Sequence, residues 1–113
     1  MEQKLKTLID TVVLAFPRTK KSEVFFNRRE LEAILRIYGR KVIAGEWRDY
    51  AIDQLDDKAM FSIFRRSSEM PLYRVVKTPE NAKKQGIYSV LGVGGTILKR
   101  GHQLASVLAW LEK

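Results

Sequence analysis

The chain of 113 residues contains no cysteine, only one histidine and no apolar run long enough to cross a membrane. The absence of cysteine excludes disulfides, thiolate zinc sites and cysteine nucleophiles, and it is typical of a reducing cytoplasm. A membrane-spanning helix needs about 20 apolar residues. The apolar N-terminal segment is interrupted by Lys6 and Asp10 and is followed by no small-residue cleavage site, which argues against a signal peptide. We therefore expect a cytoplasmic protein.

Acidic residues are scarce in the second half of the chain. Residues 1–57 carry 11 Lys/Arg against 10 Asp/Glu, whereas residues 58–113 carry 10 against 3. The formal net charge of +8 therefore comes almost entirely from the second half. A charge asymmetry of this kind indicates a polyanionic or acidic partner.

The remaining composition is that of an ordinary globular domain, with 45% apolar and 30% charged residues. The aromatic residues, 10% of the chain, are too numerous for intrinsic disorder. We expect a single domain over residues 1–113, because domains cluster near roughly 100 to 150 residues. It divides into an N-terminal helix at 1–17, a basic connector at 18–22 and an α+β body at 24–113.

Two helices are predicted ahead of the sheet. Six apolar residues at helical spacing form one stripe that ends at Pro17. This stripe packs on the core, which we favour, or pairs with another chain or lies on a membrane surface. Asn27 and Glu30 form a capping-box pattern, so a second helix begins near Arg28. It either ends at Gly39 or, as we favour, runs to Gly45 as its C-terminal glycine. The stripe consists of Leu5, Leu8, Ile9, Val12, Val13 and Phe16.

The apolar period changes to two from Trp47 onward, which predicts strands. Asp56 and Asp57 mark the turn of a hairpin whose second strand lies within 58–66, and shorter strands are expected at 72–77, 87–91 and 96–100. A closing helix is expected at about 101–112. The predicted fold class is α+β, a four- or five-stranded antiparallel meander sheet with the N-terminal helices and one C-terminal helix packed on one face.

Four segments carry a resemblance to a known family, namely residues 26–31 (FNRREL), 38–42 (YGRKV), 44–50 (AGEWRDY) and 98–102 (LKRGH). They are similar to a family of small uncharacterised alphaproteobacterial proteins, a domain of unknown function. The resemblance runs from about residue 24 to the C-terminus. It implies a bacterial cytoplasmic origin and no mechanism.

The basic second half carries the functional prediction. Lys and Arg on a sheet and its loops neutralise phosphates, and aromatic side chains among them stack on unpaired bases. We predict a non-enzymatic protein that contacts nucleic acid through a basic sheet surface. RNA is favoured over duplex DNA, because no helix is basic at positions that would face a major groove. The predicted phosphate contacts are Arg65, Arg66, Arg74, Lys77, Lys83, Lys84, Lys99 and Arg100, and the predicted stacking residues are Tyr73 and Tyr88.

The same residues allow a plainer interpretation, in which the cations only solubilise the surface and the aromatic side chains point into the core. A protein-interaction or regulatory adaptor is the alternative function. It would use the N-terminal apolar stripe or the helix face that carries Arg36 and Arg40. An enzyme is a weaker hypothesis, because no arrangement of nucleophile, base and oxyanion donors is recognisable. Neither a cofactor nor a metal is expected.

Three further motifs favour structural interpretations. Residues 92–95 (GVGG) are rich in glycine, but no Gly-Lys-Ser/Thr follows, so a hairpin turn is favoured over a phosphate loop. His102 is expected in the first turn of the last helix, in a structural or surface role. An acidic cluster lacks the spacing of a calcium loop, so we interpret it as a solvated face and a turn. It consists of Asp49, Asp53, Asp56 and Asp57.

Overall fold

The computed structural model describes residues 23–66 and 70–113 of the chain. The predicted helix at 1–17 and the connector at 18–22 lie outside these residues. The elements, in chain order, are α2 (Arg28–Ile43), β1 (Asp49–Gln54), β2 (Ala59–Phe64), β3 (Tyr73–Lys77), η1 (Pro79–Asn81), β4 (Tyr88–Leu91), η2 (Val93–Gly95), β5 (Ile97–Gly101) and α3 (Leu104–Leu111).

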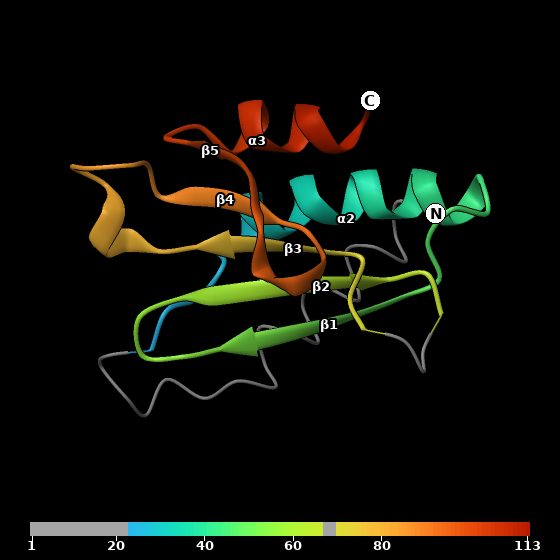
Figure 1. Ribbon diagram of the computed structural model, residues 1–113, viewed down its shortest axis with the longest axis horizontal. Coiled ribbons are helices and arrows are strands. Elements are labelled where there is room, and N and C mark those ends of the chain that lie inside the picture. The colour runs from blue at the N-terminus through green and yellow to red at the C-terminus, as the bar shows by residue number, and fades with distance from the viewer. Residues whose placement is uncertain (1–22, 67–69) are drawn as a thin grey trace.

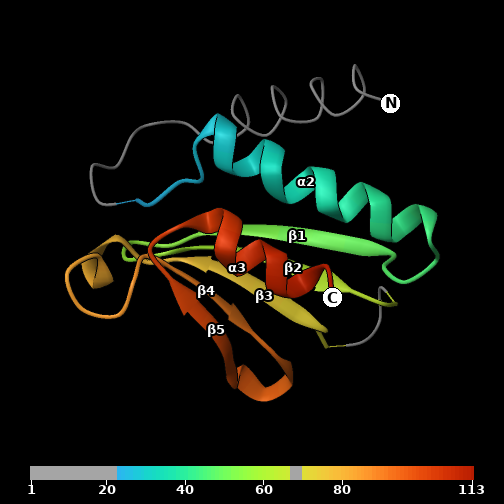
Figure 2. The ribbon, with the colours of Figure 1, turned by 90° about the horizontal axis from the view of Figure 1, so that it is seen from above.

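The five strands form one antiparallel sheet in the order β1–β2–β3–β4–β5, so each strand pairs with its neighbours in the chain (Figure 1). The predicted meander is therefore confirmed, with five strands. α2 precedes the sheet, α3 follows it, and both lie on the same side of it (Figure 2). The α+β class is confirmed, with one described helix before the strands in the chain and one after them.

The strand register determines which side chains face the helices. Phe61 of β2 lies opposite Ile52 of β1 and Val75 of β3, and Val75 lies opposite Val90 of β4. Phe61, Val75 and Val90 are completely buried, as is Leu35 of α2. The hydrophobic core therefore lies between this side of the sheet and the two helices.

The opposite side of the sheet, which we name the open face, carries no α-helix within the part of the chain that the structure describes (Figure 2). Its residues follow from the alternation of side chains along each strand and, on β5, from the pairing with β4, whose register shifts at a bulge between Val90 and Leu91. They are Asp49, Ala51, Asp53, Met60, Ser62, Phe64, Arg74, Val76, Ser89, Leu91, Ile97 and Arg100. Most of them are small or apolar, and the charged members lie on β1, β3 and β5.

The predicted ends of the second helix are confirmed. The backbone N–H of Glu30 donates to Asn27 Oδ1 at 2.9 Å, and the backbone N–H of Asn27 donates to Glu30 Oε1 at 2.8 Å, which completes the capping box. At the other end, Ala44 caps the helix and Gly45 follows with φ +78°. A left-handed glycine after the cap is a common end of a helix.

The last helix begins later than predicted, because Gly101 still belongs to β5, where it pairs with Tyr88. A Cβ atom on Gly86 would lie only 2.5 Å from the carbonyl group of Gly101, so the loop before β4 approaches β5 as closely as backbone permits. His102 is therefore an exposed residue of the bend before the helix and does not lie in the first helical turn. Gln103 is the N-cap of α3.

Candidate nucleic-acid interface

The eight cations predicted to contact phosphate lie in several parts of the molecule. Arg65 and Arg66 are exposed at the end of β2, and Lys83 and Lys84 are exposed in the loop between η1 and β4. The other four divide between the two sides of the sheet. Arg74 and Arg100 lie on the open face, whereas Lys77 and Lys99 are in register with Ala59 and Val90 on the helix-covered side. The structure therefore does not bring the eight together on one surface.

Lys77 and Tyr88 contact a carboxylate below the helix layer. Lys77 Nζ lies 2.8 Å from Glu30 Oε1 and donates to the carbonyl oxygen of Phe25, also at 2.8 Å. The Tyr88 hydroxyl donates to the other oxygen, Glu30 Oε2. Burial, and then this hydrogen bond, raise the pKa of the Tyr88 phenol well above its ordinary value. These contacts join β3 and β4 to the start of α2.

Tyr73 is the second predicted stacking residue, and its ring lies in an aromatic cluster. Its centroid is 5.9 Å from the ring of Trp110 and 6.3 Å from the ring of Trp47, both in edge-to-face arrangements. Trp47 is buried and contacts the core. Tyr73, which is half-buried, therefore forms with Trp47 an aromatic wall of a cavity.

This cavity, which we name the Arg65 cavity, has a volume of about 360 Å³. It opens where the C-terminal ends of α2 and α3 meet the start of β3. Three of its residues are cationic and one is acidic. The lining residues are Lys41, Gly45, Glu46, Trp47, Arg65, Leu72, Tyr73, Leu111 and Lys113.

The cations of the Arg65 cavity differ in their partners. Lys41 Nζ lies 3.4 Å from Glu46 Oε1 and 5.9 Å from the centroid of the Trp47 ring. Arg65 and Lys113 form no ion pair with any described residue. The C-terminal ends of the two helices contribute partial negative charge, which Lys41 in the last turn of α2 offsets. Two cations that form no ion pair with a described residue therefore lie beside an aromatic wall.

Sequence reasoning missed three cations of this region, Lys41, Arg48 and Lys113. The backbone N–H of Arg48 donates to the carbonyl oxygen of Phe64 at 2.8 Å, which places Arg48 beside the end of β2 and next to Arg65. Lys41 and Arg48 belong to the half of the chain that has almost no net charge, so charge counting along the chain does not detect them. The folding of the chain brings these two residues close to Arg65.

The other motifs lie as follows. Residues 92–95 form a turn between β4 and β5, as predicted. Asp49 and Asp53 share the open face of β1, and no group of three metal-ligating side chains occurs among the described residues. Asp57 lies beside a neighbouring cation, because Lys58 Nζ is 4.0 Å from Asp57 Oδ2. Both side chains are exposed, so this ion pair is weak.

No helix in the described part of the chain is long and apolar enough to cross a membrane. A family model with the description "Protein of unknown function (DUF2794)" matches residues 24–108, and the chain belongs to this family. Neither a curated protein nor a solved structure matches the chain. The resemblance to a domain of unknown function is thus confirmed.

Proposed function

We propose that this member of the family is a non-enzymatic protein that binds single-stranded nucleic acid, RNA in the first place, through the surface around the Arg65 cavity. The observation that supports the proposal is that cations and aromatic side chains line the same cavity. Arg65 and Lys113 have no acidic partner among the described residues, and Trp47 and Tyr73 line the same cavity.

Each kind of residue at this surface suits one part of a nucleotide. Cations hold the phosphate backbone by charge and set its position without selecting a sequence. Aromatic and apolar side chains accept bases, which expose their faces only when they are unpaired. A cavity of about 360 Å³ is near the lower end of small-molecule sites, which suits a single nucleotide-sized group.

The proposed interface is smaller than the surface expected from the sequence. It retains Arg65, Arg66 and Tyr73 from that prediction and adds the three cations that the fold brings beside them. Lys77 and Tyr88 are excluded because their polar atoms already contact Glu30. The loop with the two lysines follows the other end of β3, about 13 Å along the strand from Tyr73.

The test is fluorescence anisotropy of the full chain with labelled single-stranded RNA, hairpin RNA and duplex DNA at roughly 50 and 200 mM salt. We expect binding to single-stranded RNA that weakens steeply as salt rises. Reversal of the two arginines, Arg65→Glu with Arg66→Glu, should abolish binding at the lower salt concentration.

A matched control separates a local site from general charge attraction. Lys83→Glu with Lys84→Glu changes the net charge by the same amount at two exposed positions away from the cavity. We expect this control to weaken binding only modestly. Equal losses in the two double variants would show that binding depends on net charge and has no site, and an absence of binding at low salt would exclude a nucleic-acid function.

An adaptor role is the alternative to nucleic-acid binding. The apolar stripe that it would use lies outside the described residues. On α2, Arg36 is exposed, and Arg40 Nη2 lies 3.1 Å from Glu112 Oε2 in a half-exposed pair. If no nucleic acid binds, Arg36→Glu combined with Arg40→Glu is the variant to compare with the unchanged protein in capture of partner proteins.

A further inference from the structure

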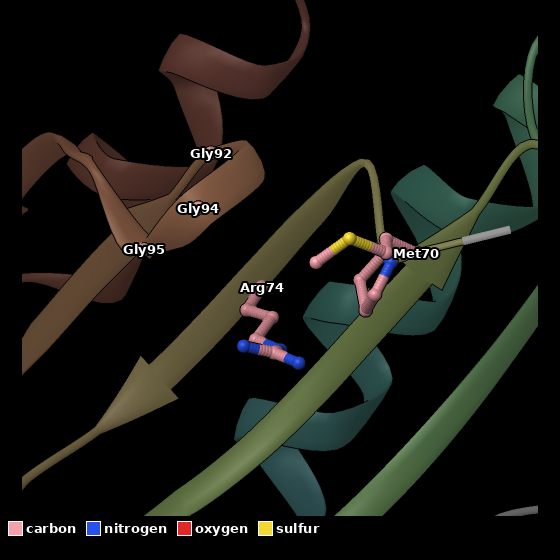
Figure 3. A pocket seen from close by; sticks show the side chains of 6 residues that line it. Met70, Arg74, Gly92, Gly94 and Gly95 are labelled. Atoms are coloured by element: carbon pink, nitrogen blue, oxygen red, sulfur yellow. The ribbon is translucent and has the colours of Figure 1, made fainter.

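A second cavity lies on the open face, away from the proposed nucleic-acid interface. We name it the Arg74 pocket, and its volume is about 270 Å³. Figure 3 shows the Arg74 side chain between the glycine turn on one side and Met70 on the other. The lining residues are Met70, Pro71, Arg74, Gly92, Gly94 and Gly95.

Among the residues that the structure describes, Arg74 is the only charged one that lines this pocket. Its Nε atom is buried and has no hydrogen-bond partner among the described residues. In the register of the sheet, Arg74 lies between Ser62 and Leu91, so neither neighbour across the strands supplies a negative charge. A buried guanidinium donor without an acceptor is unfavourable, and native proteins usually supply such a donor with water or a ligand.

The glycine turn leaves its backbone open to the pocket. Gly94 and Gly95 have φ values of +79° and +84°, and a Cβ atom at either position would meet nothing within 4 Å. The N–H of Gly95 donates to the carbonyl oxygen of Gly92 at 3.1 Å, and the N–H of Gly92 donates to the carbonyl oxygen of Thr96 at 2.7 Å. Bare backbone in a left-handed turn allows a ligand atom to approach closely.

Among the described residues, the apolar side chains of Met70 and Pro71 line the pocket, and two further exposed apolar side chains belong to the glycine turn and the start of β5. Met70 is 69% exposed and Val93, in the turn itself, is 61% exposed. Ile97 lies opposite Leu91 on the open face and is 46% exposed. Large exposed apolar side chains at a cavity are typical of a binding site. One cation is matched by one negative charge, so a carboxylate fits this pocket better than a phosphate monoester, which carries about −1.5 to −2 charge at neutral pH.

We propose that the Arg74 pocket binds a carboxylate group attached to an aliphatic chain. The guanidinium donates hydrogen bonds to the carboxylate oxygens, and the Met70 and Pro71 side chains cover the aliphatic part. Two sources carry this chemistry, a free aliphatic acid and the C-terminus of a peptide that ends in an apolar residue.

The test follows the NMR signals of the backbone amides and of the arginine Nε–H groups in the full chain during titration. Hexanoate represents the free acid, and N-acetyl-Gly-Gly-Leu with a free carboxylate represents the peptide. Acetate, hexan-1-ol and the amide of the same peptide are the controls. We expect hexanoate or the free peptide to shift the signals of Arg74 and the glycine turn, and we expect hexan-1-ol and the peptide amide to leave them unchanged.

Variants show whether the charge of Arg74 is responsible. Arg74→Gln should weaken binding by about tenfold or more, because a hydrogen bond to a charged group is lost. Arg74→Lys keeps the charge without the two-pronged geometry and should lose less, which protects the test if Arg74→Gln folds poorly. Arg100→Gln, on the same face, and Arg65→Glu with Arg66→Glu should change the affinity less than about twofold.

The proposal is overturned if neither acid shifts these signals at millimolar concentration. It is also overturned if hexan-1-ol binds as well as hexanoate, or if Arg74→Gln and Arg100→Gln weaken binding equally. The strength of the peptide relative to hexanoate identifies the source of the carboxylate. A failure of RNA binding would leave these titrations unaffected, because the two cavities share no lining residue.

Discussion

Lys77 and Arg74 lie on the same short strand, β3, and face opposite sides of the sheet. Lys77 extends under the helices, where Glu30 and the carbonyl group of Phe25 accept hydrogen bonds from its ammonium group. Arg74 extends over the open face, where its buried Nε atom has no acceptor among the described residues. One strand thus carries one cation with satisfied hydrogen bonds and one without.

The difference shows how a cation that stabilises the fold is distinguished from one that is available to a partner. The Lys77 ion pair is mostly buried, with side-chain exposures of 17% for Lys77 and 9% for Glu30. Each partner there compensates the loss of water around the other. A cation without a partner among the described residues, such as Arg74 or Arg65, contributes little to folding and retains its capacity to bind an anion. The count of basic residues alone does not make this distinction.

The largest effect is expected from matched substitutions on β3. Lys77→Met should lower the free energy of unfolding by about 3 kcal/mol, because the Glu30 carboxylate would stay below the helix layer without its cation. Arg74→Met should change it by less than about 1 kcal/mol, because the apolar stem is retained and an unsatisfied donor is removed. Urea unfolding of both variants measures the difference, and equal losses would break the comparison.

The glycines of the two regions give a second, smaller contrast. Gly86, in the loop beside Lys77 and Tyr88, has φ +103°, and a Cβ atom there would overlap the Gly101 carbonyl group. Gly86→Ala should cost about 2 to 3 kcal/mol, since backbone must move. Gly94→Ala in the open turn has φ strain only and should cost about 1 kcal/mol. Thermal unfolding compares them, and a larger loss for Gly94→Ala would contradict the proposed close packing of Gly86.

Much of the fold was predictable because its signals are local in sequence. The capping box of Asn27 and Glu30 sets the start of α2 within a single turn, and Gly45 marks its end through one left-handed residue. Strand alternation and the turn at Asp56 and Asp57 predict the first hairpin for the same reason. The start of α3 was misplaced because Gly101 joins β5 through pairing with β4, a contact with no trace in the neighbouring residues.

The candidate sites were less predictable, because they depend on which residues the topology brings together. Lys41 and Arg65 line one cavity although 23 residues separate them in the chain. The alternation of β3 was visible in the sequence, but which of its two sides the helices cover was not. That choice decides whether Lys77 or Arg74 is free. The sequence therefore indicates a basic protein without identifying the cations that are available.

Salt dependence of RNA binding tests the comparison at the proposed interface. Arg65→Gln should reduce the slope of log affinity against log salt by about one, as expected for the loss of one phosphate contact. Lys77→Met, measured on the folded fraction, should leave the slope unchanged because this lysine faces Glu30. Anisotropy titrations over a salt series measure both slopes. If the two variants shift the slope equally, the buried lysine also contributes to binding and the distinction fails.

The smallest effect concerns alkaline pH and the tyrosines. Burial, and then the charge of Asp49, raise the pKa of Tyr38 to about 12, and burial with the Glu30 contact also raises the pKa of Tyr88. Unfolded tyrosine releases its proton near pH 10, at about its ordinary pKa. Between that pH and the folded pKa the native state binds more protons, so the free energy of unfolding falls as pH rises. The full stabilisation is present below about pH 10, the pKa of an unfolded tyrosine.

Tyr88→Phe should therefore act in two ways. At neutral pH it should lower the free energy of unfolding by about 1 kcal/mol, because the hydroxyl no longer donates to Glu30. Above about pH 10, the pKa of an unfolded tyrosine, the free energy of unfolding of this variant should fall less steeply with pH than that of the unchanged protein. The reason is that the variant lacks one group with a raised pKa. Tyr38→Phe should show the shallower alkaline slope without disrupting the Glu30 contacts. Urea unfolding over a series of alkaline pH values measures these slopes, and slopes identical to that of the unchanged protein would show that neither phenol is linked to folding.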